Sequence, residues 1–427
     1  MMVSTLALNG GTPFISQPHP PAWPQYDERT VGLVAEMVAR GEVHYEDRHP
    51  IIEALSNHFC QLTGMPHALA VNSASTGLLL GYLAMGFGPG DEVLCSPLSY
   101  YITATALLAV GATPVFCDVE PDTGNIDPAR IAERVTPRTK GVVVTHLWGH
   151  PASMLDIMAQ ASRHNLAVIE DASHAHGATL DGRAVGSFGD VGVFSLGTRK
   201  QISGGAAGIA VSRDRSVHER MMVMGHHPGL LEEEIRDPAL QTFVQTGLGL
   251  NARPGLIAAA LALSHLERLP DLLRIRARNF NALNAALSGL GDLDPMQTRP
   301  GATRGGWFGY KLMASPDFLQ RINLDRFVAA VRAEGAKMRR EGVVPIHTTQ
   351  TFASGHRPPL GPWAHREDGF PAVCGDACPN AIALHGRLLT LAAKYFHDDA
   401  PDLVAAYAGA IRKVLEHSDT LVKTHST

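Results

Sequence analysis

The sequence predicts an α/β protein with a mostly parallel sheet of about seven strands in a large domain, followed by a smaller α+β domain. Seven short apolar runs lie between residues 67 and 212, and most show no alternation of apolar and polar residues. Such runs are typical of strands buried on both faces of a parallel sheet. Helical patterns such as "STGLLLGYLAMGF" and "SMLDIMAQASRHN" separate several of them, and this alternation indicates the α/β class.

The expected strands are, in chain order, "HALAVNS" (67–73), "DEVLCSP" (91–97), "TPVFCDV" (113–119), "GVVVTHLWG" (141–149), "LAVIEDA" (166–172), "GDVGVFSL" (189–196) and "GIAVS" (208–212). Residues 254–290 contain strong helix formers, interrupted at Pro270, and a turn-rich linker follows over 294–306. A chain of 427 residues is long enough for two domains. We therefore expect an N-terminal arm and a large domain over 1–265, and a linking helix with a small α+β domain over 266–427.

Composition excludes several classes of function. The net charge of −5 comes from 36 basic and 41 acidic residues without a run of Lys or Arg, so we expect no nucleic-acid partner. No apolar run approaches the roughly 18–20 residues that span a bilayer, and the N-terminus does not resemble a signal peptide. The five cysteines are odd in number and irregularly spaced, which favours a reducing, cytoplasmic location. No second pair stands at a zinc-site spacing from Cys374 and Cys378, so we expect no metal.

Three polar groups follow expected strands, where ligands bind in open α/β sheets. The segment "NSAST" (72–76) opens a helix, Asp171 ends a strand, and Ser195 and Lys200 follow another. Each has an ordinary alternative: a helix cap, a structural carboxylate and a surface charge. Together they supply what pyridoxal phosphate (PLP) needs, namely an anion pocket, a carboxylate for the ring nitrogen and a lysine for a Schiff base. The run "GGAAG" (204–208) lacks GxGxxG and leads into a strand, so it is not a dinucleotide loop.

A collinear series of motifs makes the chain recognisable over residues 6–265. It includes "LALNGGTPF", "GFGPGDEV", "GATPVFCDVEPDTGNIDP", "HLWGHPASMLDI", "VIEDASHAHGA" and "DGRAVGSFGDVGVFS". The chain resembles the DegT/StrS-type aminotransferases, fold-type I PLP enzymes that aminate keto-sugars and keto-cyclitols. Its first motif is similar to the opening of the aminocyclitol and aminohydroxybenzoate branch.

The resemblance implies roles for residues around the cofactor ring. Lys200 matches the Schiff-base lysine and Asp171 matches the carboxylate that pairs with the pyridinium, so both are the expected catalytic residues. His174 stands where the family has Gln or His, next to the phenolic oxygen. Tyr100 stands where an aromatic ring stacks on the pyridine.

The resemblance also implies a phosphate site. Ser195 matches a phosphate ligand, and Ala74 and Ser75 stand where the family carries a Gly-Thr contact. Asn251 matches an asparagine that reaches the phosphate of the neighbouring subunit. The resemblance therefore implies a homodimer with shared active sites.

Some positions depart from the family pattern. Ala206 in "SGGAAG" occupies a glutamate position, and Gly197 replaces a histidine or glutamine. The segment "NARPGLIAAA" lacks the Ser-Glu expected after Asn-Tyr-Arg. These changes leave the identities of the substrate and the amino donor open.

We interpret the chain as a ping-pong aminotransferase of antibiotic or other specialised-metabolite biosynthesis. It would move an amino group from L-glutamate or L-glutamine to a keto-sugar or keto-cyclitol, with Lys200 as general base and acid. One alternative is a PLP enzyme that performs dehydration or other C–N or C–C chemistry, although the family's sugar dehydratases carry histidine in place of this lysine. Another is a catalytically silent PLP-binding sensor. We expect the segment 347–373 and the region of His226 and His227 to line the acceptor pocket.

Overall fold

A computed structural model describes residues 5–45, 47–355, 361–365, 373 and 375–422. Its largest element is a seven-stranded sheet in the order β1-β9-β8-β5-β4-β2-β3. The strands are β1 (His67–Val71), β2 (Glu92–Cys95), β3 (Thr113–Phe116), β4 (Thr139–Thr145), β5 (Ala167–Asp171), β8 (Val191–Ser195) and β9 (Gly208–Ser212). Only β9 is antiparallel to its neighbours. All seven expected strands and the mostly parallel sheet are confirmed.

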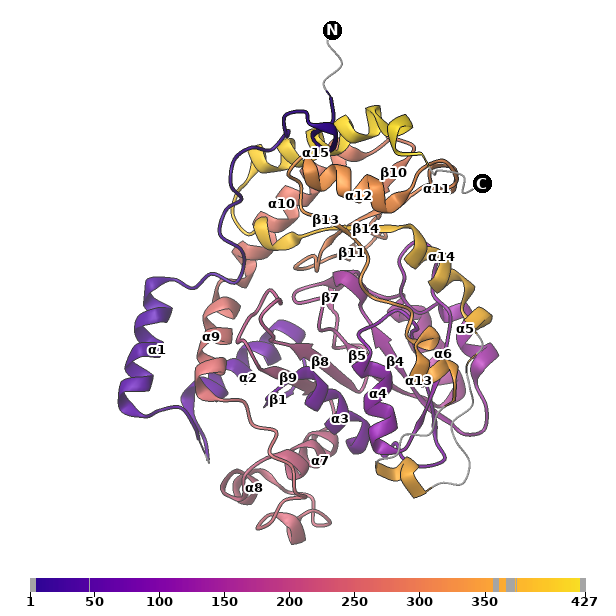
Figure 1. Ribbon diagram of the computed structural model, residues 1–427. Coiled ribbons are helices and arrows are strands. Elements are labelled where there is room, and N and C mark those ends of the chain that lie inside the picture. Colours follow the sequence, from indigo (N-terminus) through magenta and orange to yellow (C-terminus); the bar gives the residue numbers. More distant parts are fainter. Residues whose placement is uncertain (1–4, 46, 356–360, 366–372, 374, 423–427) are drawn as a thin grey trace.

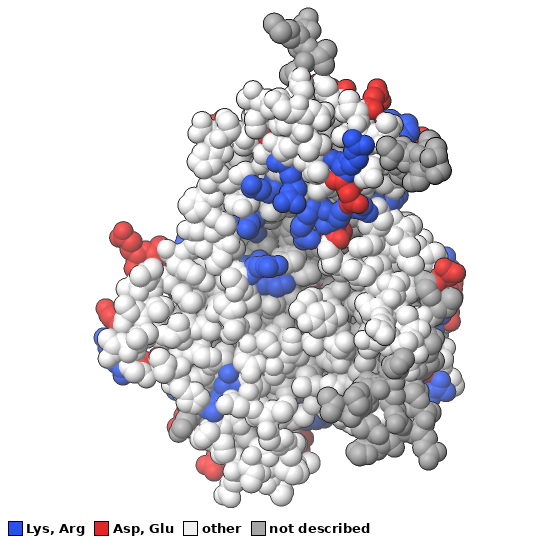
Figure 2. All heavy atoms as spheres, in the orientation of Figure 1, with Lys and Arg blue, Asp and Glu red and all other residues white. Residues whose placement is uncertain are grey.

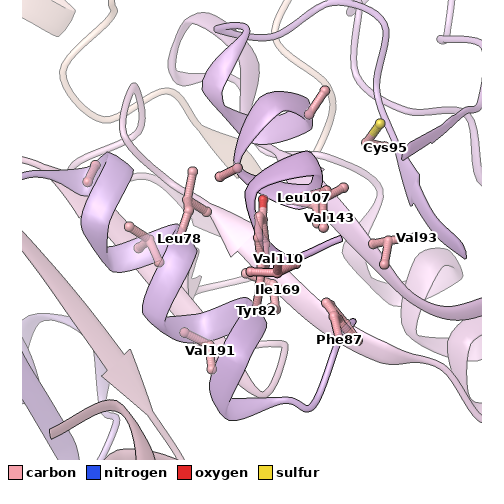
Figure 3. Packing of buried hydrophobic residues seen from close by; sticks show 14 of the residues in the cluster. Leu78, Tyr82, Phe87, Val93, Cys95, Leu107, Val110, Val143, Ile169 and Val191 are labelled. Carbon is pink, nitrogen blue, oxygen red and sulfur yellow. The ribbon is translucent and has the colours of Figure 1, made fainter. Parts of the chain in front are cut away.

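Helices cover both faces of this sheet (Figure 1). One face carries α3 (Ala74–Ala84), α4 (Ile102–Val110) and α7 (Arg215–Gly225); the other carries α2 (Pro50–Thr63), α5 (Pro128–Arg134), α6 (Met154–His164) and α9 (Leu256–Glu267). Val143 of β4 belongs to the same buried cluster as Leu78 and Tyr82 of α3 (Figure 3), whereas Val142 belongs to the cluster that contains Ile157 of α6 on the opposite face. Because both faces are buried, the strands show no apolar–polar alternation.

A smaller sheet lies above the large one in the view of Figure 1. Its four antiparallel strands are β10 (Leu293–Pro295), β12 (Tyr310–Ala314), β14 (Leu388–Leu391) and β13 (Met338–Arg340), in that order. It packs with α10 (Leu269–Leu287), α11 (Pro316–Arg321), α12 (Leu324–Ala333) and α15 (Pro401–Glu416). The expected helical break is present, because Pro270 lies in the first turn of α10. A third sheet has the order β11 (Ala302–Thr303), β6 (Thr179–Leu180) and β7 (Arg183–Ala184).

Two segments of the chain cross between the two larger sheets. Leu6, just before η1 (Ala7–Asn9), packs in the core of the small sheet, and α1 (Glu28–Arg40) then packs on α9. In the other direction, α13 (Gln350–Ala353) and α14 (Pro379–Arg387) pack against the large sheet. The division at residues 265 and 266 therefore stays a prediction.

The remaining described elements are short. They are α8 (Pro228–Glu234), η2 (Leu147–Gly149), η3 (Gln241–Phe243), η4 (Ile346–Thr348), η5 (Gly361–His365), η6 (Gly375–Ala377), η7 (Ala393–Tyr395) and η8 (Ser418–Leu421). In the part of the chain that the structure describes, no helix combines the length and apolar character needed to cross a membrane.

Candidate active site

The loop between β8 and β9 carries Lys200, and contacts from the N-terminal segment fix its backbone. The Trp23 indole Nε1 donates a hydrogen bond to the Lys200 carbonyl over 2.7 Å, and the Tyr26 hydroxyl donates to the Ser203 carbonyl over 2.9 Å. The Ser203 amide donates to His265 Nδ1 over 3.1 Å. These three hydrogen bonds hold a loop of irregular structure in one conformation. Functional residues often lie on loops that a rigid scaffold positions in this way.

The Lys200 side chain points toward the Phe308 ring. Its Nζ lies 4.1 Å from the ring centroid, and the His174 ring stacks on Phe308 with centroids 4.0 Å apart. Burial lowers the pKa of Lys200 to about 8; the charge of Asp171 opposes this shift and that of Arg199 adds to it. An amine with this pKa is neutral in about a tenth of molecules at pH 7, far more than for an ordinary lysine, so it can act as a nucleophile or a base.

Asp171 ends β5 beside this lysine. It pairs with Val193 of β8 and with Thr145 of β4, so three carboxyl-terminal strand ends meet here. The Asp171 side chain is 4% exposed, and its Oδ1 accepts a hydrogen bond from the Ser173 amide over 3.0 Å. A buried carboxylate with spare acceptor capacity suits a protonated ring nitrogen.

The preceding residue, Glu170, fixes the end of β5. Its buried carboxylate accepts hydrogen bonds from the Gly186 amide over 2.8 Å, the Gly189 amide over 2.7 Å and His146 Nε2 over 2.8 Å. His146 Nδ1 accepts from the Ala152 amide over 3.1 Å, so the ring proton lies on Nε2. Glu170 therefore ties β5 to the turn before β8.

His174 follows Asp171 and is also buried. Burial and the charges of Lys200 and Lys311 hold the pKa of His174 well below its ordinary value, so the ring is neutral. The Trp148 amide donates to His174 Nδ1 over 3.4 Å. The proton of the neutral ring is then on Nε2, which makes this nitrogen a hydrogen-bond donor.

Ala74 and Ser75 form the first turn of α3, next to Ser195. The Ser73 hydroxyl caps the helix by accepting from the Thr76 amide over 3.1 Å, while the Ala74 and Ser75 amides have no acceptor within the described residues. Gly208 pairs with Ser195, and a Cβ added to Gly208 would lie 2.5 Å from the Ala74 nitrogen. This close approach brings a hydroxyl and two free amides together at a helix N-terminus, and such a donor set fits a phosphate.

The other two predicted cofactor residues lie on the surface. Tyr100 is 52% exposed, and its ring lies 4.3 Å from that of Tyr101. Asn251 is exposed, and its carbonyl accepts from Asn72 Nδ2 over 3.2 Å, close to the start of α3. The structure therefore brings Asp171, His174 and Lys200 together, and pairs Ser195 with the α3 turn. The contact of Asn251 with a neighbouring subunit stays a prediction.

A cavity of about 650 Å³ opens beside the lysine loop, between it and the small sheet. Its walls include residues that the sequence reasoning missed: Trp148, Arg276, Phe308, Lys311 and Glu341. The sequence contains a signal for one of them. Lys311 is a charged residue inside the apolar strand run "YKLMA", where a buried charge points to a functional or paired role.

Two other predictions concern residues away from this cavity. In the segment 347–373, the residues 356–360 and 366–372 lie outside the described residues, as does Cys374, and the described ones do not line the cavity. His226 and His227 do not line it either, and His226 is buried. The acceptor role of these two regions stays a prediction.

Known proteins resemble this chain along most of its length. The model of the DegT/DnrJ/EryC1/StrS aminotransferase family matches residues 26–362. An L-glutamine:2-deoxy-scyllo-inosose aminotransferase of Streptoalloteichus tenebrarius is 30% identical, with 97% of this chain and 99% of that protein covered. The enzyme of the same name from Streptomyces fradiae is 31% identical, with 98% and 100% covered.

Solved structures show the same fold. DesI in the presence of its TDP-sugar product has a TM-score of 0.78 at 26% identity, and the match covers 98% of each chain. An aminotransferase from Psychrobacter cryohalolentis has a TM-score of 0.81 at 25% identity, with 94% of this chain and 100% of that chain covered. The fold-type I class expected from the motifs is confirmed. The chain belongs to the DegT/DnrJ/EryC1/StrS aminotransferase family.

Proposed function

We propose that this aminotransferase binds PLP and moves an amino group from L-glutamine or L-glutamate to a keto-cyclitol or keto-sugar in a ping-pong reaction. The observation that carries the proposal is the amine of Lys200, which lies against Phe308 with a pKa of about 8 and beside Asp171. The names of the relatives support L-glutamine as donor and a keto-cyclitol as acceptor. A place in antibiotic or other specialised-metabolite biosynthesis is part of the proposal.

The described donors and acceptors fit PLP part by part. The Ala74 and Ser75 amides and the Ser195 hydroxyl would hold the phosphate, and Asp171 would hold the ring nitrogen. His174 Nε2 would donate to the phenolic oxygen, and Tyr100 would cover the ring. Asn251 would come from the partner subunit of a homodimer, and that dimer and a cytoplasmic location are part of the proposal. Bound PLP supplies the electron sink for bond breaking at the donor's α-carbon.

The chain's own residues handle the proton. Neutral Lys200 would take the proton from the α-carbon of the donor and later release it, a task that needs a pKa near the working pH. Asp171 would keep a proton at the ring nitrogen by accepting its hydrogen bond. Trp23 and Tyr26 fix the loop backbone, so the Lys200 amine returns to the same place between the two halves of the reaction.

The test is the first half-reaction, followed by absorption spectroscopy of the PLP-loaded protein. Adding L-glutamine or L-glutamate without any acceptor should convert the absorption of the bound aldehyde into that of the bound amine. Lys200→Ala should lower the rate by about a hundredfold or more. Lys140→Ala, which removes an exposed lysine at the start of β4, should leave it unchanged. A spectrum that responds to neither donor would contradict the proposal and favour the non-transaminating or sensor alternative.

A further inference from the structure

A short loop, residues 304–309, carries the Phe308 ring to the Lys200 amine. The Lys200 Nζ lies 4.1 Å from the centroid of that ring, and the Phe308 amide donates a hydrogen bond to the Trp148 carbonyl over 3.1 Å. Trp307, the residue before Phe308, has a φ of 49°, a left-handed conformation that is strained for a bulky side chain. Strained backbone persists only where the surrounding structure holds it. The contacts that hold this loop therefore decide where the Phe308 ring lies.

The Gly306 carbonyl is the point at which two side chains hold the loop. Gln201 Nε2 donates to this oxygen over 2.7 Å, and Arg276 Nη1 donates to it over 2.8 Å. A carbonyl oxygen has two lone pairs, so these two donors complete its acceptor capacity. A Cβ added to Gly306 would lie 2.0 Å from Gln201 Cγ. Any larger residue at position 306 would therefore push the Gln201 side chain away.

Arg276 differs from the other basic residues of the cavity. Figure 2 shows Lys and Arg side chains gathered around a hollow in the region where β13 and β14 lie in Figure 1. The exposed basic residues that line the cavity include Arg332, Lys337 and Arg339. Arg276, from α10, is only 5% exposed, and burial lowers its pKa to about 10.

This buried guanidinium has a neutral partner. Within the described residues, no carboxylate oxygen lies within 4.0 Å of the Arg276 side-chain nitrogens. A buried polar group needs a hydrogen-bond partner to offset its loss of water. The Gly306 carbonyl is such a partner for Arg276, so the position of the guanidinium is coupled to the position of the loop.

Gln201 connects the same carbonyl to the lysine loop. It follows Lys200 directly in the chain, and its side chain is buried. The backbone of the lysine loop is itself fixed, because Trp23 and Tyr26 donate hydrogen bonds to two of its carbonyls. Gln201 therefore sets the spacing between the fixed loop that carries the amine and the loop that carries the aromatic ring.

We propose that Gln201 and Arg276 are positioning residues for Lys200, which hold the Phe308 ring against its amine through the Gly306 carbonyl. This inference rests on the proposed role of Lys200. Burial is the largest influence on this amine, since an ammonium that loses water loses its hydration. If the ring withdrew, water would reach the amine, and its pKa would rise toward that of an exposed lysine. The two residues would thus keep the lysine reactive without touching the reacting atoms.

The test measures the pKa of Lys200 in the full-length protein freed of any cofactor. Acetic anhydride acetylates only the neutral amine, so the labelling rate of Lys200, followed by mass spectrometry, has its midpoint at that pKa. We expect a midpoint of about pH 8 in the wild type. In Gln201→Met, which removes the donor without changing a charge, the midpoint should be about 0.5 to 1 pH unit higher. Gly306→Ala, which displaces the Gln201 side chain instead of deleting its amide, should raise the midpoint too.

The matched control is Gln241→Met. Gln241 Nε2 also donates to a backbone carbonyl, that of Ile235, over 2.6 Å, but Gln241 does not line the cavity. Its loss should leave the midpoint unchanged. Arg276→Met should raise the midpoint as Gln201→Met does. In a Phe308→Leu background neither change should raise it further, because both act through the Phe308 ring.

An unshifted midpoint in both Gln201→Met and Gly306→Ala overturns the inference. An equal rise in Gln241→Met also overturns it, because a general loosening of the protein would then explain the result. A rise in Arg276→Met that persists in the Phe308→Leu background overturns it for Arg276, whose charge would then act directly. A raised midpoint in Gln201→Met, in a protein that shows no half-reaction with L-glutamine or L-glutamate, would instead contradict the proposed function alone.

Discussion

At the scale of single residues, the reactivity of Lys200 comes from its surroundings. An exposed lysine keeps its proton up to a pH of about 10.4. The Phe308 ring and the neutral His174 replace water around the Lys200 amine, and burial lowers its pKa to about 8. The neutral amine is thereby populated at a pH where ordinary lysines are almost fully charged.

This shift predicts the pH dependence of cofactor loading. Only the neutral amine adds to an aldehyde, so the rate of PLP incorporation into cofactor-free protein should rise with pH and level off above about 8. Arg199→Ala removes a cation that lowers the Lys200 pKa, so it should move the midpoint to higher pH. Stopped-flow absorbance measures this rate. Arg163→Ala, an exposed change on α6, serves as control, and a wild-type midpoint near 10 would contradict the assignment.

At the scale of elements, the lysine loop depends on the N-terminal segment. Tyr26→Phe removes the hydroxyl that donates to the Ser203 carbonyl but keeps the ring stacked on His265 at 4.6 Å. We expect a loss of about 1 kcal/mol in the free energy of unfolding and faster hydrogen exchange over residues 197–206. Tyr45→Phe is the matched control, because the buried Tyr45 hydroxyl has no partner among the described residues. Unchanged hydrogen exchange in Tyr26→Phe would show that the loop keeps its conformation without this hydrogen bond.

The small sheet is joined across three strands by one buried ion pair. Lys311 of β12 pairs with Glu341 after β13 and donates to the Thr390 hydroxyl of β14 over 2.9 Å. Glu341→Gln leaves a buried ammonium without its counter-charge, so it should lower the free energy of unfolding by about 3 kcal/mol. The double variant Lys311→Met/Glu341→Gln should lose less than the sum of the single variants. Additive losses in denaturant titrations would argue against coupling.

The same pair predicts an acid sensitivity. Burial alone would raise the pKa of Glu341, but the charge and hydrogen bonds of Lys311 outweigh burial and lower it to about 2. Because the folded-state pKa lies below the unfolded value, the stabilisation is present above that value and is lost as the pH falls toward 2. The stability difference between wild type and the double variant should therefore change between about pH 4.5 and 2.

At the scale of the whole molecule, the sequence predicts the large sheet better than the cavity. The runs "GVVV" of β4 and "AVI" of β5 are visible because a strand that is buried on both faces carries apolar residues at successive positions. Asp171, Ser195 and Lys200 are visible because they follow such runs at one edge of the sheet. These signals are local, and a single sequence contains them.

The missing parts depend on contacts between distant segments. Phe308 lies 108 positions after Lys200, and Trp23 lies 177 positions before it, so periodicity does not reveal either contact. The packing of α13 and α14 against the large sheet is not visible in the sequence for the same reason. The cavity beside the lysine loop is not visible in the sequence either. Its basic residues, such as Arg199, Arg276 and Arg339, come from separate stretches of the chain and form no charged run.

The crossing of the N-terminal segment also sets when the enzyme becomes competent during synthesis. The Ala7 and Phe14 amides bind the Glu334 carboxylate, and the Trp23 amide binds the Lys394 carbonyl over 2.8 Å. The Thr12 carbonyl accepts from Lys413 Nζ over 3.1 Å. These partners leave the ribosome hundreds of residues after the segment that needs them. The large sheet can form earlier. The N-terminal segment, whose Trp23 and Tyr26 hold the Lys200 loop, gains its own partners only when translation is almost finished. Incomplete chains therefore contain Lys200 without the contacts that position it.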